Sequence, residues 1–169
     1  DAGSPGHPPE EVAPAALGAH ARPAITYELR RAHDRARWYA RGPPENYPDR
    51  NRGAVLGVWD TEVDEPPYLV PQEFGLRTDC RWFEFLDPAT ERVVRLEAIE
   101  PSTLHVSATR FTTDELYDAA HETDLRPRRT LVVHADVAHR GLGTASCGPD
   151  VLDRYRITPG TYRFSYRLA

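Results

Sequence analysis

Short runs in which apolar and polar residues alternate cover much of the chain after residue 24. Side chains of a β-strand point to opposite faces in turn, so a period of two predicts a strand with one buried face. The clearest run is the C-terminal TYRFSYRL, in which Tyr162, Phe164, Tyr166 and Leu168 share one face. Further runs of this kind occupy 25–30, 80–86, 92–99, 103–111 and 130–137. Because Pro and Gly separate these runs, the pattern predicts an all-β sandwich.

Two segments depart from the alternation. In TTDELYDAAH, Thr112 is placed to cap a helix, and Glu115 three residues later completes a capping box, which predicts a short helix near 113–120. Residues 1–24 are rich in Pro, Ala and Gly without apolar periodicity, which is typical of a linker. We therefore expect the sandwich to occupy residues 25–169.

Charge and composition remove several classes of function. A net charge of −5 disfavours a nucleic-acid partner, and the basic run at 126–129 is interpreted as a solvated loop. The absence of lysine excludes Schiff-base and P-loop lysines. There is no long apolar run and no leader-like segment, so we expect no membrane partner and a cytoplasmic protein. Cys80 and Cys147 are expected to be free thiols.

The loop at 139–150, HRGLGTASCGPD, combines glycines, hydroxyls and a thiol. One hypothesis is a thiol nucleophile, Cys147 activated by His139, but the sequence supplies no elbow that would expose the sulfur. Another is a phosphate-binding loop, yet no helix follows whose N-terminus would hold the anion. Both are disfavoured against a turn that carries side chains to a neighbouring site.

Histidines in two of the predicted strands lie out of step with the apolar positions. His105 and His134 therefore fall on polar sheet faces, and Asp136 shares the face of His134. A His and a carboxylate facing a cavity would provide general acid–base chemistry on a sugar. The favoured interpretation is a solvated polar face. No pair of residues has the spacing of a zinc site, so no metal ligands are predicted.

Five motifs in one order carry a family resemblance: GPPENYPDR, PYLVPQEFGLRTDCRWFEF, FTTDEL, HRGLGTASCGPDV and PGTYRFSYRL. Together they resemble the C-terminal, small-chain region of the family 2 β-galactosidases over residues 36–169, whereas residues 1–24 show no match. The resemblance implies an antiparallel supersandwich like that of galactose mutarotase. It also implies retaining hydrolysis of terminal β-D-galactosides by an enzyme larger than this chain.

The resemblance also places the catalytic residues elsewhere. Retaining hydrolysis uses two carboxylates about 5 to 5.5 Å apart, and in the family both belong to a separate (β/α)₈ barrel domain or large subunit. No Asn-Glu pair of the family's acid/base type occurs here. We therefore expect no catalytic residue and no cofactor in this chain, with the family's Mg and Na sites mainly in other domains. The implied partners are the barrel, the galactoside and further subunits of an oligomer.

Site residues follow by matching the motifs. The loop implied to approach the substrate contributes His139, Gly141, Gly143, Ser146 and Cys147. A network implied to support it comprises Glu45, Asn46, Tyr47, Asp49, Arg50, Arg77, Asp79 and Trp82.

The loop differs from the family pattern in one functional position. Cys147 stands where the family has a sugar-stacking Trp, the loop is about one residue shorter, and the paired aspartates before it are missing. Phe74 and Cys80 also replace the usual Asn and aliphatic residue, as packing changes. Two other functions stay open: a free-standing carbohydrate-binding module, and a mutarotase-like epimerase using His105, His134 or Asp136.

Overall fold

The structure is a computed structural model that describes residues 22–30, 33–63, 68–69, 73–143 and 150–169. Strands and short helices follow one another along the chain as β1 (Ala24–Arg30), β2 (Arg35–Gly42), β3 (Val55–Glu62), β4 (Arg77–Cys80), β5 (Trp82–Asp87), β6 (Arg92–Glu100), β7 (Leu104–Thr109), α1 (Thr113–Asp118), η2 (Glu122–Asp124), β8 (Thr130–Asp136), η3 (Asp153–Tyr155) and β9 (Ser165–Leu168). Among the residues described, no helix has the length and apolarity needed to cross a membrane.

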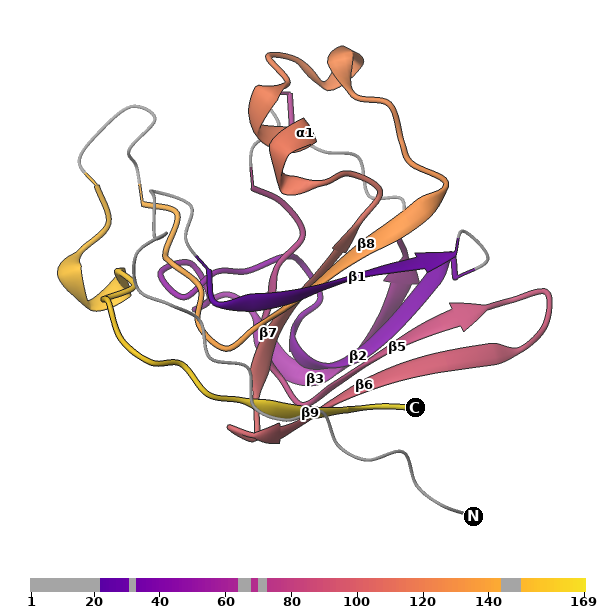
Figure 1. Ribbon diagram of the computed structural model, residues 1–169, viewed down its shortest axis with the longest axis horizontal. Coiled ribbons are helices and arrows are strands. Elements are labelled where there is room, and N and C mark those ends of the chain that lie inside the picture. Colours follow the sequence, from indigo (N-terminus) through magenta and orange to yellow (C-terminus); the bar gives the residue numbers. More distant parts are fainter. Residues whose placement is uncertain (1–21, 31–32, 64–67, 70–72, 144–149) are drawn as a thin grey trace.

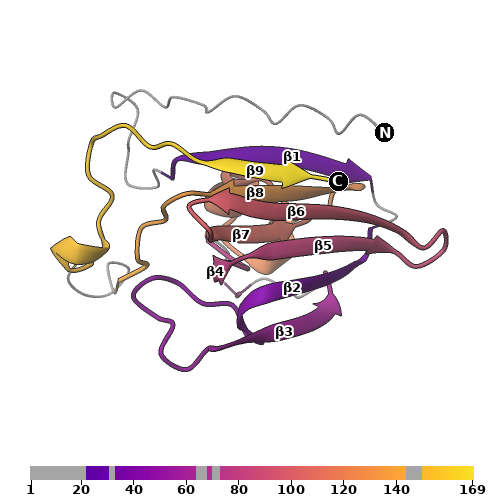
Figure 2. The same ribbon diagram turned by 90° about the horizontal axis from the view of Figure 1, so that it is seen from below.

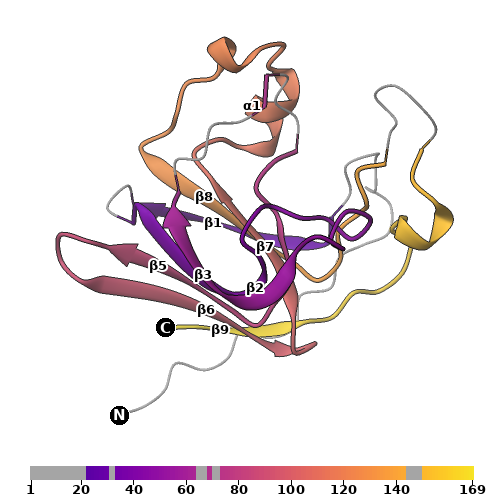
Figure 3. The same ribbon diagram turned by 180° about the vertical axis from the view of Figure 1, so that it is seen from behind.

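Two antiparallel sheets face each other and enclose the core (Figures 1 and 3). One sheet has the strand order β1-β8-β7-β4, and the other has the order β3-β2-β5-β6-β9. Helix α1 lies beyond the four-stranded sheet, on the side away from the five-stranded sheet (Figure 1). The prediction of an all-β sandwich with one short α-helix is thus confirmed within the described residues.

Alternation along the strands builds the core. In β8, Leu131, Val133 and Ala135 are at most 1% exposed and pack into the main apolar cluster. Within the five-stranded sheet, Trp38 of β2 stacks on its cross-strand partner Phe83 of β5, with the ring centroids 5.5 Å apart. Each buried aromatic ring contributes stability through the apolar area that it removes from water.

The prediction of one strand over 80–86 is wrong. Cys80 ends β4 in the four-stranded sheet, whereas Trp82 begins β5 in the five-stranded sheet, and Arg81 between them donates its backbone N–H to Tyr39 O at 2.9 Å. Asp79 has a φ of 56°, which turns the chain where it changes sheet. Strands β2 and β3 were missed, and the C-terminal strand begins at Ser165, later than the alternation predicts.

The predicted capping box is confirmed at α1. Thr112 Oγ1 accepts the backbone N–H of Glu115 at 3.2 Å, and the Glu115 carboxylate accepts the N–H of Thr112 at 2.8 Å. The helix ends at Asp118, two residues before the predicted end. Leu116 packs into a second, smaller apolar cluster with Phe74, Phe111 and Leu125, and this cluster holds the helix on the sandwich.

Candidate functional site

Three loop segments meet at one end of the sandwich, where Figure 2 shows them beyond the ends of the strands. They are residues 43–54 between β2 and β3, residues 137–143 after β8, and the region of η3. Gly141 N donates to Tyr155 O at 3.0 Å, and Leu142 N donates to Asp49 Oδ1, also at 3.0 Å. The segment 141–143 is therefore hydrogen-bonded to both other loops.

Asp49 is the main contact of this segment with the 43–54 loop. Its Oδ1 and Oδ2 accept the backbone N–H groups of Leu142 and Gly143, the latter at 2.7 Å. A Cβ at Gly141 would lie 2.6 Å from Asp49 Cγ, so only glycine fits there without displacement. Gly143 has a φ of 64°, a conformation that favours glycine. The two glycines thus allow a close backbone approach to one carboxylate.

An ion pair connects the two chain segments that flank residues 144–149. Arg140 donates a hydrogen bond to Asp150, and Arg156 lies 3.4 Å from the other oxygen of the same carboxylate. The N–H of Val151 donates to Asp150 at 2.7 Å and, with the two arginines, lowers the pKa of Asp150. Ser146 and Cys147, both predicted to approach substrate, lie outside the described residues.

The loop containing Asp49 is itself fixed by hydrogen bonds. Glu45 accepts the N–H of Gly75 at 2.7 Å and a guanidinium hydrogen bond from Arg50 at 2.5 Å. Asn46 is 1% exposed, and its Oδ1 accepts both the N–H and the hydroxyl of Thr78. Buried and fully paired groups of this kind rigidify a loop.

Tyr47 lies within this loop and contacts His139 of the 137–143 segment. The Tyr47 side chain is fully buried, and its ring meets the His139 imidazole edge-on with centroids 5.6 Å apart. Burial, together with the nearby Glu73 and Glu45 carboxylates, raises the pKa of Tyr47 well above its usual value. The phenol is therefore neutral and serves as a packing surface for His139.

His139 belongs to a buried polar cluster, which also contains Arg22, Glu73 and Asp136. Arg22 Nη1 lies 3.5 Å from Glu73 Oε1 and 3.6 Å from Asp136 Oδ2. His139 Nε2 lies 3.7 Å and 3.9 Å from the same two oxygens. Two cationic donors thus face two carboxylates, and Asp136 is 0% exposed.

Burial and charge act on each member of the buried polar cluster. Burial raises the pKa of Asp136 to about 6, although Arg22 and His139 oppose the rise. Burial also acts to lower the pKa of His139, but Glu73 and Asp136 outweigh it and raise that pKa. For Glu73, burial favours the neutral acid, yet His139 and Arg22 lower the pKa overall. The cluster therefore favours a charged Glu73–His139 pair near neutral pH.

The face that carries His105, His134 and Asp136 is not solvated, and the sequence-based interpretation was wrong on this point. His134 is 9% exposed, and burial lowers its pKa and that of His105 to about 4. His105 and Asp136 are paired positions on β7 and β8. Arg22 lies against this face at Asp136, and Glu73 lies against His139.

Glu73 and Arg22 were missed from the sequence. Glu73 lies inside the PQEFGLR motif, so matching of that motif could have identified it as a site residue. Arg22 lies in the segment interpreted as a linker and gave no signal of its own. Its neighbours Ala24–Arg30 form β1, whose pairing with β8 brings Arg22 to Asp136.

Three residues of the predicted network lie apart from the loop. Arg77 stacks over the Trp38 ring, 5.0 Å from its centroid, between the sheets. Asp79 accepts a hydrogen bond from Arg41 at 2.5 Å. Trp82 pairs with Tyr39 and Glu97 on neighbouring strands, and the Arg95 guanidinium lies 4.5 Å from its ring centroid. The other five, Glu45, Asn46, Tyr47, Asp49 and Arg50, belong to the loop itself.

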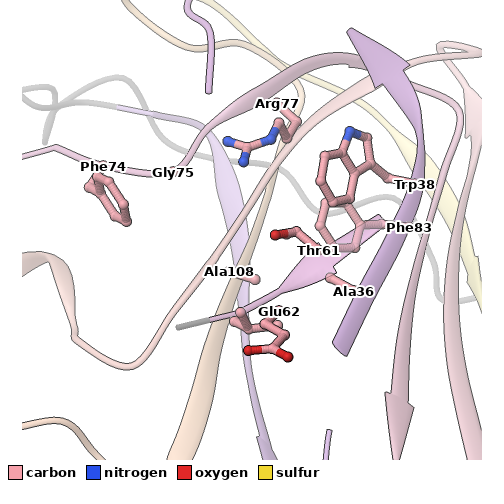
Figure 4. Close-up of a pocket in the computed structure, with 10 residues that line it drawn as sticks. Ala36, Trp38, Thr61, Glu62, Phe74, Gly75, Arg77, Phe83 and Ala108 are labelled. Carbon is pink, nitrogen blue, oxygen red and sulfur yellow. The ribbon is translucent and has the colours of Figure 1, made fainter. Parts of the chain in front are cut away.

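A small cavity opens between the sheets near Arg77 (Figure 4). Its volume is about 30 Å³, and Trp38, Phe83, Phe74 and Glu62 contribute to its lining. Such a volume suits a water molecule, whereas pockets for small ligands are roughly 300 Å³ or larger. This cavity therefore offers no sugar site by itself.

Cys80, buried in β4, is a free thiol whose pKa is raised by burial, which makes it unreactive.

Within the described residues, no three His, Cys, Asp or Glu side chains are arranged to hold a metal ion. The buried polar cluster is covered, and the hydrogen-bonded loops lie on the outside at one end. The arrangement defines a β-sandwich domain whose buried polar groups and Asp49 together fix the backbone of residues 139–143 at one end.

Comparison with known proteins agrees with a β-sandwich domain and identifies the family to which it belongs. The family described as "Beta galactosidase small chain" matches residues 9–168, so the chain belongs to the β-galactosidase small-chain family. The match begins inside the segment that we expected to be a linker.

Curated relatives carry the name β-galactosidase. The protein of Kluyveromyces lactis is 31% identical over 87% of this chain and 14% of its own length. That of Aeromonas hydrophila is 35% identical over 84% of this chain and 13% of its own length. That of an Arthrobacter species is 33% identical over 82% of this chain and 14% of its own length. The chain thus spans about one seventh of the length of these relatives.

Proposed function

We propose that this domain forms one wall of the active site of a retaining β-galactosidase whose catalytic carboxylates lie in another domain or subunit. The observation that carries the proposal is the loop base at one end of the sandwich, held by Asp49 and by the Arg140–Asp150 pair. This base belongs to the segment that resembles the family's substrate-contacting loop. A fixed base is what a loop needs in order to present side chains to a neighbouring barrel.

The two carboxylates of the buried polar cluster support a non-catalytic role for that cluster. Asp136 is fully buried, and the Glu73 side chain is 21% exposed and faces two cations. A nucleophile or acid must reach the glycosidic bond on an open face of the site. The same burial speaks against an epimerase that uses His134 and Asp136 as acid and base.

The test compares the isolated chain with the complete enzyme that contains it. Isolated, the folded chain should give no release of nitrophenol from o-nitrophenyl β-D-galactoside, whereas the complete enzyme should release it. Turnover by the chain alone would overturn the assignment of the catalytic groups to another domain. Circular dichroism of the isolated chain shows whether it is folded under the assay conditions.

A second experiment addresses the wall itself. In the complete enzyme, Cys147→Trp should lower the KM for the same galactoside several-fold, because an indole offers a stacking surface that a thiol lacks. Cys80→Trp is unsuitable as a control because Cys80 is buried, so Leu152→Trp, at a 60% exposed position, serves instead. An unchanged KM in Cys147→Trp would count against contact between this loop and the sugar.

A further inference from the structure

Asp49 contacts the substrate-side loop through two successive backbone groups. Its two carboxylate oxygens accept the N–H groups of Leu142 at 3.0 Å and of Gly143 at 2.7 Å. Hydrogen bonds to an ionised acceptor are stronger than neutral ones. Two of them, on adjacent peptide units, fix the direction of the backbone as well as its position.

Glycine at 141 brings the backbone close to this carboxylate. Gly141 is buried, and a Cβ built on it would lie within 2.9 Å of Cγ and both carboxylate oxygens of Asp49. Its N–H donates to Tyr155 O at 3.0 Å on the opposite side. The segment 141–143 is therefore confined between Asp49 and the η3 region.

Asp49 is supported from behind, so it acts as a fixed point. Arg50 N donates to Tyr47 O at 2.8 Å, which closes the turn containing Asp49. Tyr47 is fully buried, and Asn46 N donates to Leu76 O at 2.8 Å. Through these contacts the turn is joined to the segment that leads into β4, so a shift of Asp49 would disturb the sandwich.

We propose that Asp49 is a positioning residue for the galactosidase reaction: it sets the direction in which the chain leaves the sandwich after Gly143. This inference rests on the proposed function. Asp49 acts through the backbone of Leu142 and Gly143, and the substrate senses it only through the residues that follow. Its removal should therefore weaken substrate binding more than it slows the chemical step.

The first experiment measures kcat and KM for o-nitrophenyl β-D-galactoside in the complete enzyme. Asp49→Ala should raise KM about tenfold with less than about a twofold change in kcat. The KM of Asp49→Asn should fall between that of Asp49→Ala and that of the native enzyme, because the amide oxygen of asparagine still accepts one N–H. Asp60→Ala removes an aspartate that is 51% exposed on β3 and should leave both constants unchanged.

A loss of folded enzyme would give a different result from a loss of positioning. Partial unfolding reduces the concentration of active sites, so it lowers the apparent kcat and leaves KM unchanged. If Asp49→Ala showed that pattern, or if KM stayed at the native value, the positioning role would be refuted. Faster hydrogen exchange at the amides of Leu142 and Gly143 in Asp49→Ala would support it directly.

Gly141 offers a second variant whose effect depends on Asp49. In the native background, Gly141→Ala places a methyl group against the carboxylate and should raise KM about as much as Asp49→Ala does. In the Asp49→Ala background, that methyl group has room and should add less than about twofold. Fully multiplicative effects of the two substitutions would contradict a shared contact.

Replacing residues 144–149 by a Gly-Ser segment separates this inference from the proposed function. If the replacement leaves KM unchanged, the loop does not contribute to the substrate site and the proposed function fails, and the positioning role fails with it. If the replacement raises KM while Asp49→Ala behaves like the native enzyme, only the positioning role fails. A rise in both supports both.

Discussion

The two faces of strand β8 are both buried, yet they are built from opposite kinds of residue. Along β8, Leu131, Val133 and Ala135 face the apolar core, whereas Asp136 on the opposite face lies against Arg22 and His139. The apolar face is stabilised by burial alone, whereas each polar group on the other face needs a charged or hydrogen-bonding partner. Alternation along a strand therefore reports a difference between faces, and it does not report which face meets water.

The two faces also differ in what holds them. Apolar contacts contribute in proportion to the area removed from water and need no directional partner. Buried charges lose hydration, so they are favourable only where opposite charges and donors are placed correctly. The polar face therefore contributes geometry, because it fixes His139 and the start of the 139–150 loop, while the apolar face supplies most of the stability.

The largest expected effect comes from the apolar core. Trp38→Ala should lower the free energy of unfolding by about 4 kcal/mol, because it removes a 1% exposed ring that stacks on Phe83. Trp82→Ala, at a partly exposed position under Arg95, should cost about 1 kcal/mol. Guanidinium denaturation of both variants measures the difference. Equal losses would show that the core does not dominate stability.

Much of the fold was predictable because its signals are local. The alternation in β6 and β8 predicts both strands to within a residue, and the Thr112–Glu115 box predicts the start of α1. Strand β3 was missed because Leu56 and Val58 are exposed on its outer side, which obscures the alternation. The change of sheet at Arg81 is set by tertiary hydrogen bonding, so a continuous run such as CRWFEFL conceals it.

The site was predictable only in part. Resemblance to a family pointed to the 45–50 loop and to His139 and Gly141, which the structure does bring together. The buried polar cluster joins Arg22, Glu73, Asp136 and His139 from three separate parts of the chain. Such a set depends on sheet register and loop placement, and no spacing in the sequence encodes it.

Lowering the pH should have an intermediate effect on the free energy of unfolding, through the titratable groups of the polar face. The pKa of His105 and that of His134 are about 4 in the folded chain, against about 6.5 for a solvated histidine. The unfolded chain binds these protons first, so stability present above pH 6.5 is lost as the pH falls toward 4. Asp136 opposes this, because its pKa of about 6 lets the folded chain bind a proton first.

Two histidines and one aspartate, taken as these three groups alone, give a net loss of about 3 kcal/mol in the free energy of unfolding between pH 7 and pH 4. The raised pKa of His139 reduces this loss, and the lowered pKa of Glu73 adds to it. Denaturation curves across this range measure the slope. His134→Asn should remove about half of the histidine contribution and flatten the curve, whereas Asp136→Asn should steepen it by removing the opposing group. An unchanged slope in His134→Asn would show that this histidine titrates alike in the folded and the unfolded chain.

The smallest expected effect comes from an ion pair outside both faces. Arg35 and Asp60 form a hydrogen-bonded pair on the five-stranded sheet, with side chains 56% and 51% exposed. Water already solvates both charges, so a double-mutant cycle with alanine should give a coupling close to zero. The Glu73–His139 pair has a longer separation, 3.7 Å, but its side chains are only 21% and 7% exposed. A cycle through Glu73→Gln and His139→Gln should therefore give the larger coupling, because each charge left alone in the buried polar cluster loses its partner without regaining water. Equal couplings in the two cycles would mean that burial does not distinguish the polar face from the open surface.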